Sequence, residues 1–342
     1  MDVDELRDRI AEGSGVHSPE LARLRRVSPA SLVRLALMTF AAYAIISLLG
    51  GVDPDELAAT LSGAALGWVA LALVMGQLPV LTEALSTQGA STRRLAVGPL
   101  MALQAAIGFV KLAVPSTAAR MAMVVRYFQK QGVPPAEAIS ISAIETFSGF
   151  VIQIAVLVMT LVVGVGSVSV DLTAGTNSDT SDLTAVLVIV AVAALAAVTV
   201  VLAWPRLRHR LTDRMGPWLR QARSSTDVLR SPTRVTELLV GNLMSQLLFA
   251  GALAACVRAF GVEVNLAEAV VVYVVACLFG GVMPVPGGIG VMEAALTIGL
   301  VAVGVDESVA LGAAITFRIV TFYIPPIWGW AAFRWLERNT YL

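Results

Sequence analysis

Long runs of apolar residues, separated by short polar and charged stretches, dominate this sequence. A helix needs about 20 mostly apolar residues to cross the hydrocarbon core of a bilayer. The pattern therefore predicts an all-α, polytopic integral membrane protein. The apolar runs lie at 31–50, 61–82, 95–114, 137–166, 183–203, 235–259, 269–304 and 309–333, and the run 95–114 continues beyond a break as 118–128.

Two of these segments contain helix-breaking residues in their middle. Segment 95–128 is broken at Pro115-Ser116-Thr117, and segment 269–304 is broken between Pro284 and Gly290. Proline removes a backbone donor, and glycine allows unusual dihedral angles, so no straight helix passes through either break. Broken backbone at membrane depth is tolerated only where protein or a water-filled cavity satisfies it. Each break is therefore a candidate functional site.

The distribution of charge predicts the orientation of the chain. Segment 1–34 carries six Lys and Arg residues and segment 206–234 carries eight, whereas the loops near 51–60, 167–182, 260–268 and 304–308 carry none and hold ten acidic residues. Basic residues are concentrated in cytoplasmic loops. We therefore expect both termini and the basic insert to be cytoplasmic, in a protein of the cell (inner) membrane.

This orientation requires segment 95–128 to enter and leave on the cytoplasmic side and segment 269–304 to do so from outside. Each half of the chain then reads as two spans, a re-entrant helical hairpin and one span, in opposite orientations. Such an inverted repeat is typical of transporters with a site near the midplane. The alternative is that each hairpin is a kinked pair of ordinary spans.

The expected organisation follows the chain in five parts. They are a cytoplasmic polar leader (1–30), a first membrane repeat (31–166), an external loop with the first span of the second repeat (167–203), a cytoplasmic basic insert (204–234) and the remainder of the second repeat (235–342).

Three basic residues fall at membrane depth: Lys111 and Arg120 beside the first break, and Arg318 in the last span. A charge at the bilayer centre costs roughly 2.5–3.5 kcal/mol on insertion scales, so each should face a polar cavity or a partner. Glu145, Glu293 and Glu83 are the candidate partners, although the position of Glu83 near the inner end of its span also reads as interfacial. No acid lies near Lys111 and Arg120 in sequence, so anion binding is favoured for them. For Arg318 and Glu145, structural pairing and a ligand role are both open.

The two breaks add further anion-binding groups. Ser116 and Thr117 supply hydroxyls at the first break, and the backbone amides at Gly287, Gly288 and Gly290 precede a helix whose N-terminal dipole favours an anion. The predicted substrate-binding set is Lys111, Ser116, Thr117, Arg120, Glu145, Gly287, Gly288, Gly290, Glu293 and Arg318.

Composition excludes several other chemistries. The chain of 342 residues has two histidines in charged segments and two cysteines, Cys256 and Cys277, in apolar runs. We therefore expect no catalytic residues, no metal site, no cofactor and no nucleic-acid partner.

The stretch from Pro284 to Ala295, with Glu293 and the following Gly299-Leu300, resembles the lysylphosphatidylglycerol synthetase transmembrane-region (flippase-like) family. Arg318, with Tyr323 and Pro325, is similar to the family's final span. Glu145 stands where the family usually has a Glu-Arg pair, with Thr146 replacing the arginine. The resemblance implies the lipid-translocating part of such proteins without the soluble synthase domain.

The function predicted from these features is a flippase or scramblase rather than an enzyme. Its substrate would be an anionic lipid: an aminoacylated or other phospholipid, or a polyprenyl-phosphate-linked glycan. The head group would move through a polar groove at the two hairpin tips. The alternatives are a membrane scaffold for a separate lipid synthase and a membrane-embedded head-group transferase. A homo-oligomer is left open.

Overall fold

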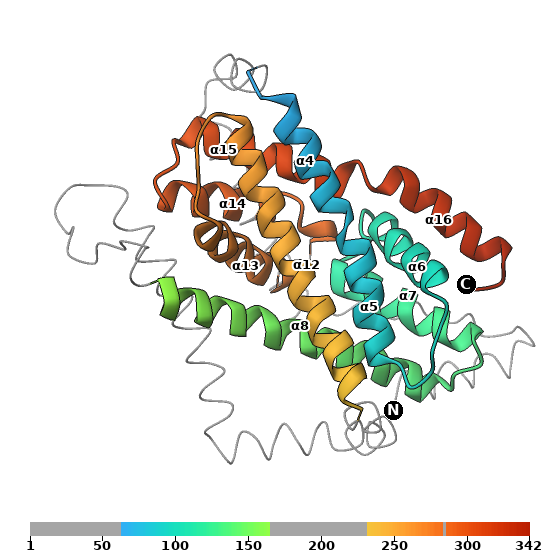
Figure 1. Cartoon of the computed structure of the whole chain (residues 1–342). Coiled ribbons are helices and arrows are strands. Elements are labelled where there is room, and N and C mark those ends of the chain that lie inside the picture. The colour runs from blue at the N-terminus through green and yellow to red at the C-terminus, as the bar shows by residue number, and fades with distance from the viewer. Residues whose placement is uncertain (1–62, 165–230, 283–284) are drawn as a thin grey trace, which may run out of the picture. The chain divides into compact units, whose positions relative to one another are not determined.

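The computed structural model describes residues 63–164, 231–282 and 285–342, and every regular element within these ranges is a helix (Figure 1). The elements, in chain order, are α4 (Leu66–Gln77), α5 (Pro79–Ala90), α6 (Val97–Val110), α7 (Ser116–Lys130), α8 (Pro135–Gly164), α12 (Pro232–Ala259), α13 (Leu266–Val282), η2 (Pro286–Gly288), α14 (Val291–Ala302), α15 (Glu307–Arg318), η3 (Ile319–Tyr323) and α16 (Pro326–Arg338).

Four helical segments in this part of the chain are long and apolar enough to cross a bilayer. The predicted all-helical, polytopic membrane fold is confirmed. The four segments are Leu66–Ala90, Pro135–Thr160, Pro232–Ala259 and Glu307–Arg338.

The predicted spans 31–50 and 183–203, the leader 1–30, the loop 167–182 and most of the insert 204–234 lie outside the described residues. The five-part organisation therefore stays a prediction.

Both predicted breaks occur, and each separates two short helices. Before and after the first break, α6 has 14 residues and α7 has 15; around the second, α13 has 17 and α14 has 12. At 1.5 Å per residue, α6 is only about 21 Å long, which is less than the ~30 Å hydrocarbon core. These lengths fit helical hairpins, whereas their entry from opposite faces of the membrane stays a prediction.

Helix α12 packs closely against α5 because glycine lies at the contact points of the two helices. A Cβ atom at Gly241 would come within 2.5 Å of the Thr82 carbonyl oxygen, and one at Gly89 within 2.4 Å of the Leu238 backbone nitrogen. Small residues at such positions let transmembrane helices approach closely. This contact places polar residues of α5 and α12 side by side.

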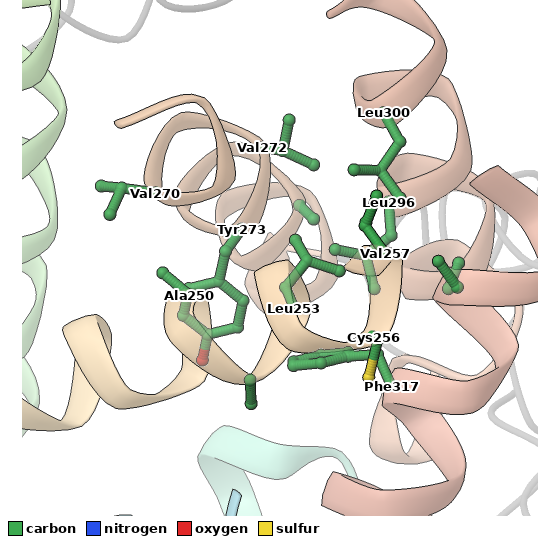
Figure 2. Packing of buried hydrophobic residues seen from close by; sticks show 14 of the residues in the cluster. Ala250, Leu253, Cys256, Val257, Val270, Val272, Tyr273, Leu296, Leu300 and Phe317 are labelled. Carbon is green, nitrogen blue, oxygen red and sulfur yellow. The ribbon is translucent and has the colours of Figure 1, made fainter. Parts of the chain in front are cut away.

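A second packing region joins α12 to the three helices that follow it (Figure 2). Leu253 and Val257 of α12 pack with Leu296 and Leu300 of α14 in one buried hydrophobic cluster. Tyr273 of α13 belongs to the same cluster, and its ring lies edge-on to Phe317 of α15 with 5.9 Å between centroids. These contacts fix the helices that flank the second break.

The last spanning segment is irregular immediately after Arg318. Residues Ile319–Tyr323 form a π-helical turn, and α16 begins just beyond it with Pro326 in its first turn. Gln77, at the end of α4, donates a 3.0 Å hydrogen bond from Nε2 to the Val320 carbonyl oxygen. π-helical turns in proteins are frequent at functional sites. Here the turn follows directly after a buried arginine.

Candidate functional site

The first break leaves the N-terminal end of a helix open. Helix α6 ends at Val110 with Lys111 as its C-cap residue, and α7 begins at Ser116 after Pro115. No described side chain caps the start of α7. The first amides of a helix lack intrahelical acceptors and carry a partial positive charge. Because Ser116 and Thr117 line a pocket, this positive end borders a polar space.

Arg120, on the second turn of α7, is held between two carboxylates. Its Nη2 lies 2.6 Å from Oε2 of Glu83, and its Nη1 lies 2.8 Å from Oε1 of Glu145. Both acids lie far from Arg120 in sequence, because α5 and α8 bring them from 37 and 25 residues away. Glu83, which reads as interfacial in the sequence, is thus an ion-pair partner of Arg120. The anion-binding role expected of Arg120 stays a prediction.

Glu145 is the most deeply buried member of this cluster, with 3% of its side chain exposed. Its Oε1 accepts a second hydrogen bond, at 2.7 Å, from the Thr87 hydroxyl. Gln104 donates to the same hydroxyl at 2.7 Å. The other carboxylate oxygen, Oε2, is buried and has no hydrogen-bond partner among the described residues. A buried oxygen atom without a hydrogen bond costs free energy of desolvation, so the Glu145 carboxylate is the least well satisfied group of this network.

Glu83, Arg120 and Glu145 line one pocket of about 210 Å³ between α5, α7, α8, α12 and α13. Its charged lining residues are Glu83, Lys111, Arg120 and Glu145. Helix α12 contributes neutral polar groups, Asn242, Ser245 and Gln246.

Lys111 forms no ion pair with any residue in the described ranges, and its side chain is only partly exposed. The pocket therefore contains an ammonium group that has no carboxylate partner within the described ranges.

The second break differs from the first, because its charged side chains, Arg318 and Glu293, form an ion pair with each other. Nε of Arg318 lies 2.8 Å from Oε1 of Glu293, and Nη2 donates at 3.0 Å to the Gly287 carbonyl oxygen. The Tyr323 hydroxyl also donates to Glu293 Oε1, at 3.1 Å. The Arg318 guanidinium carbon lies 3.9 Å from the centroid of the Phe322 ring. Cation–π contact of this kind adds to the ion pair.

The loop amides at this break are also used within the chain. The amide of Gly288 donates to Val285, and that of Ile289 donates to Pro286. The amide of Gly290 donates to Glu293 Oε2 at 2.7 Å, so a carboxylate of the same helix caps the N-terminus of α14. An acid in the first turn of a helix satisfies the positive end of the dipole. The anion-binding role predicted for Gly287, Gly288 and Gly290 stays a prediction, and the amides of Gly288 and Gly290 have acceptors within the chain.

The ion pairs identify the partners of Arg318 and Glu145, whereas a ligand role for either residue stays a prediction. These two residues are not each other's partner: Arg318 is bound by Glu293, and Glu145 is bound by Arg120. The two clusters are nevertheless near neighbours, because η2 contacts α7. The structure thus brings both breaks together, with an open polar pocket at the first and a closed ion pair at the second.

Several polar residues in and behind the pocket were not predicted from the sequence. Thr87 donates a hydrogen bond to Glu145, and Gln104 donates one to Thr87. Asn242 of α12 binds Ser86 of α5. Asn242 donates to the Ser86 hydroxyl at 2.8 Å and to the Ser148 hydroxyl at 3.1 Å. The available signal was the presence of amide side chains within apolar runs. Within the described ranges, no group of three or more metal-ligating side chains is placed to bind an ion.

The family relationship agrees with this arrangement. The family model described as the lysylphosphatidylglycerol synthase TM region matches residues 31–329, which include both breaks and Arg318. No curated protein matches the chain. Membership of this family indicates a function connected with membrane lipids. The chain belongs to the lysylphosphatidylglycerol synthase TM-region family and is a multi-pass membrane protein.

Proposed function

We propose that this protein is a transporter rather than an enzyme, and that it moves an anionic lipid between the leaflets of the membrane. The observation that carries the proposal is the pocket at the first break. It contains Lys111 without an ion-pair partner among the described residues, beside the uncapped start of α7. A phosphate group suits both features, because helix N-termini and ammonium groups each favour anions.

In this proposal the head group occupies the pocket while the acyl or polyprenyl chain stays in the bilayer. Lys111 and the start of α7 hold the phosphate. Arg120 supplies a second cation. Glu83 and Glu145 form ion pairs with it before the lipid binds. The substrate is a phospholipid, aminoacylated or not, or a polyprenyl-phosphate-linked glycan, since all of these present the same phosphate chemistry.

The second break has a positioning role in this proposal. Arg318 ties the loop at Gly287 to the last spanning segment, and Glu293 caps α14. Because η2 contacts α7, this closed cluster supports the wall of the pocket from the neighbouring hairpin. Arg318 and Glu293 would then affect transport through the shape of the pocket rather than by touching phosphate.

Reconstituted liposomes test the proposal. The purified protein is inserted into vesicles that carry a fluorescent phosphatidylglycerol or a fluorescent polyprenyl phosphate in both leaflets, and a membrane-impermeant quencher reports the lipid that reaches the outer leaflet. We expect exchange to be faster in vesicles with protein than in vesicles without it, for at least one of the two lipids.

The variant Lys111→Gln makes this test specific to the pocket. A charge-assisted hydrogen bond is worth about 1.5–3 kcal/mol, so its loss should slow exchange by about tenfold or more. Lys130→Gln, the same substitution at an exposed position at the end of α7, is the matched control and should leave exchange unchanged. Equal exchange with and without protein, for both lipids, would refute transport and favour a scaffold for a separate synthase. Chemical change of the labelled head group would favour a transferase.

A further inference from the structure

We propose that the pocket takes up one proton with each anionic head group, and that Glu145 carries this proton. The inference rests on the proposed lipid-binding function and adds how the pocket keeps its charge balanced. Transport would then be coupled to protons, because the lipid phosphate and the proton would occupy and leave the pocket together.

The charged groups that line the pocket balance one another. Its lining contains two acids, Glu83 from α5 and Glu145 from α8, and two cations, Lys111 after α6 and Arg120 from α7. Helix α13 contributes the Tyr273 phenol, and α12 contributes neutral amides and a hydroxyl. The neighbouring pair of Arg318 and Glu293 is also neutral as a unit. With both acids ionised, the formal charges of the pocket cancel.

A phosphodiester brings one negative charge into this balanced pocket. A net charge at membrane depth is costly, and so is a buried charge without a partner. Uptake of one proton by a carboxylate restores neutrality. Because two carboxylates share the Arg120 guanidinium, the phosphate can replace one of them as its partner without leaving the guanidinium unpaired.

Glu145 is better placed than Glu83 to be the replaced carboxylate. Its side chain is 3% exposed, whereas that of Glu83 is 21% exposed and can still be reached by water. Glu145 Oε2 already has no partner in the described part of the chain. If Arg120 Nη1 turns to the phosphate, Glu145 keeps only the Thr87 hydrogen bond on Oε1. A carboxylate left so poorly solvated becomes protonated.

The exchange is balanced in atoms and charge. Before binding, Arg120 pairs with ionised Glu145. After binding, Arg120 pairs with the phosphate, and Glu145 is a neutral carboxylic acid that has gained one proton from the buffered aqueous solution, whose buffer acid becomes its conjugate base. No covalent bond of the lipid is made or broken. Because the proton and the lipid bind together, the affinity for lipid should fall as pH rises, by up to tenfold per pH unit where one proton is taken up.

Calorimetry on the full-length protein in detergent measures this directly. Binding of dihexanoyl phosphatidylglycerol is titrated in pairs of buffers that differ in ionisation enthalpy, at several pH values between about 6 and 8. The difference in heat between the two buffers gives the number of protons taken up per lipid bound. We expect uptake that approaches one proton per lipid at the upper end of the range, together with weaker binding.

Two variants assign the proton to its residue. Glu145→Gln is uncharged like the protonated acid, so we expect it to bind the lipid without proton uptake and with an affinity that does not change with pH. Glu137→Gln, on the same helix and bonded to the Thr92 hydroxyl outside the pocket, should take up protons as the unchanged protein does. Thermal unfolding of each variant in detergent shows whether it is folded.

The outcomes separate this inference from the function on which it rests. Lipid binding without proton uptake in the unchanged protein would overturn the inference and leave lipid transport standing, whatever the folding of the variants. Unchanged uptake in folded Glu145→Gln would overturn the assignment to Glu145. Failure to bind the lipid, together with no exchange in liposomes, would refute the proposed function itself.

Discussion

Nη2 of Arg318 donates a 3.0 Å hydrogen bond to the backbone carbonyl of Gly287, 31 residues earlier in the chain. Through this bond the last spanning segment holds the loop of the second helix break. The same guanidinium binds Glu293, which in turn caps the helix that follows the loop. One arginine therefore fixes both the loop and the start of α14.

Arg318→Ala should destabilise the protein strongly. The substitution leaves the Glu293 carboxylate and the Gly287 carbonyl without their partner in a mostly buried place, and breaking a buried pair costs about 3–5 kcal/mol. The measurement is the melting temperature of the purified protein in detergent. Arg258→Ala is the matched control, because the pair of Arg258 and Glu263 is exposed and should contribute no more than about 1 kcal/mol. Equal losses in the two variants would contradict the role of Arg318.

The Gly287→Ala variant should be less stable than a variant in which alanine causes backbone strain without a steric clash. Gly287 has φ +60°, and a Cβ atom there would lie 2.1 Å from Cζ of the Phe322 ring. Gly304 has φ +88° with open space around it, so Gly304→Ala measures the backbone term, about 1–2 kcal/mol. We expect Gly287→Ala to lower the melting temperature further than Gly304→Ala does. Adding Phe322→Leu, which removes the ring edge, should recover part of the difference.

Gly241→Ala should push α12 away from α5. The new Cβ atom would lie 2.5 Å from the Thr82 carbonyl oxygen and 2.6 Å from the Ser86 backbone nitrogen, and neither backbone atom can move without its helix. We expect a loss of stability of about 1–3 kcal/mol, as for other overpacked contacts. Gly108→Ala on α6 meets nothing within 4 Å and is the control. A melting temperature equal to that of the control would show that the two helices can separate at little cost.

The opposite entry of the two hairpins can be tested by labelling single cysteines with a membrane-impermeant reagent. Cys256 and Cys277 are first replaced by alanine, and Thr117→Cys or Ile289→Cys is then added at a site exposed beside each break. The inverted repeat predicts that Thr117→Cys reacts from the cytoplasmic side and Ile289→Cys from outside. Lys130→Cys and Glu263→Cys serve as references for the two sides. Reaction of both tips from one side would refute the inverted arrangement.

The sequence was sufficient to locate the helices and their breaks. Proline and glycine interrupt a helix through local geometry, so Pro115 and Gly287 could be identified as break positions without knowledge of the fold. Within the described ranges, apolar length pointed to the four segments that are long enough to span the membrane. Both kinds of information belong to residues that are close together in the chain.

The pairing of charges could not be read in the same way. Arg120 meets Glu83 because of the way α5 and α7 are placed in the fold. The residues of α5 indicate its polar side but do not reveal which helix that side meets. The sequence distance of 37 residues gave no indication of the contact. The irregular turn of the last span was not apparent either, because it precedes Pro325 and its Val320 carbonyl accepts a hydrogen bond from Gln77 of another helix.

The π-helical turn after Arg318 contains, in effect, one residue more than a regular helix would need. Each α-helical residue advances the helix by about 100° around its axis. Deletion of a residue within Ile319–Tyr323 would let regular hydrogen bonding continue, and it would turn α16 by about that angle relative to Arg318. Gly329, whose hydrogen-only side chain lets α16 approach the Ala105 carbonyl on α6, would then no longer face that helix. The extra residue thus sets which face of α16 is directed at the first hairpin.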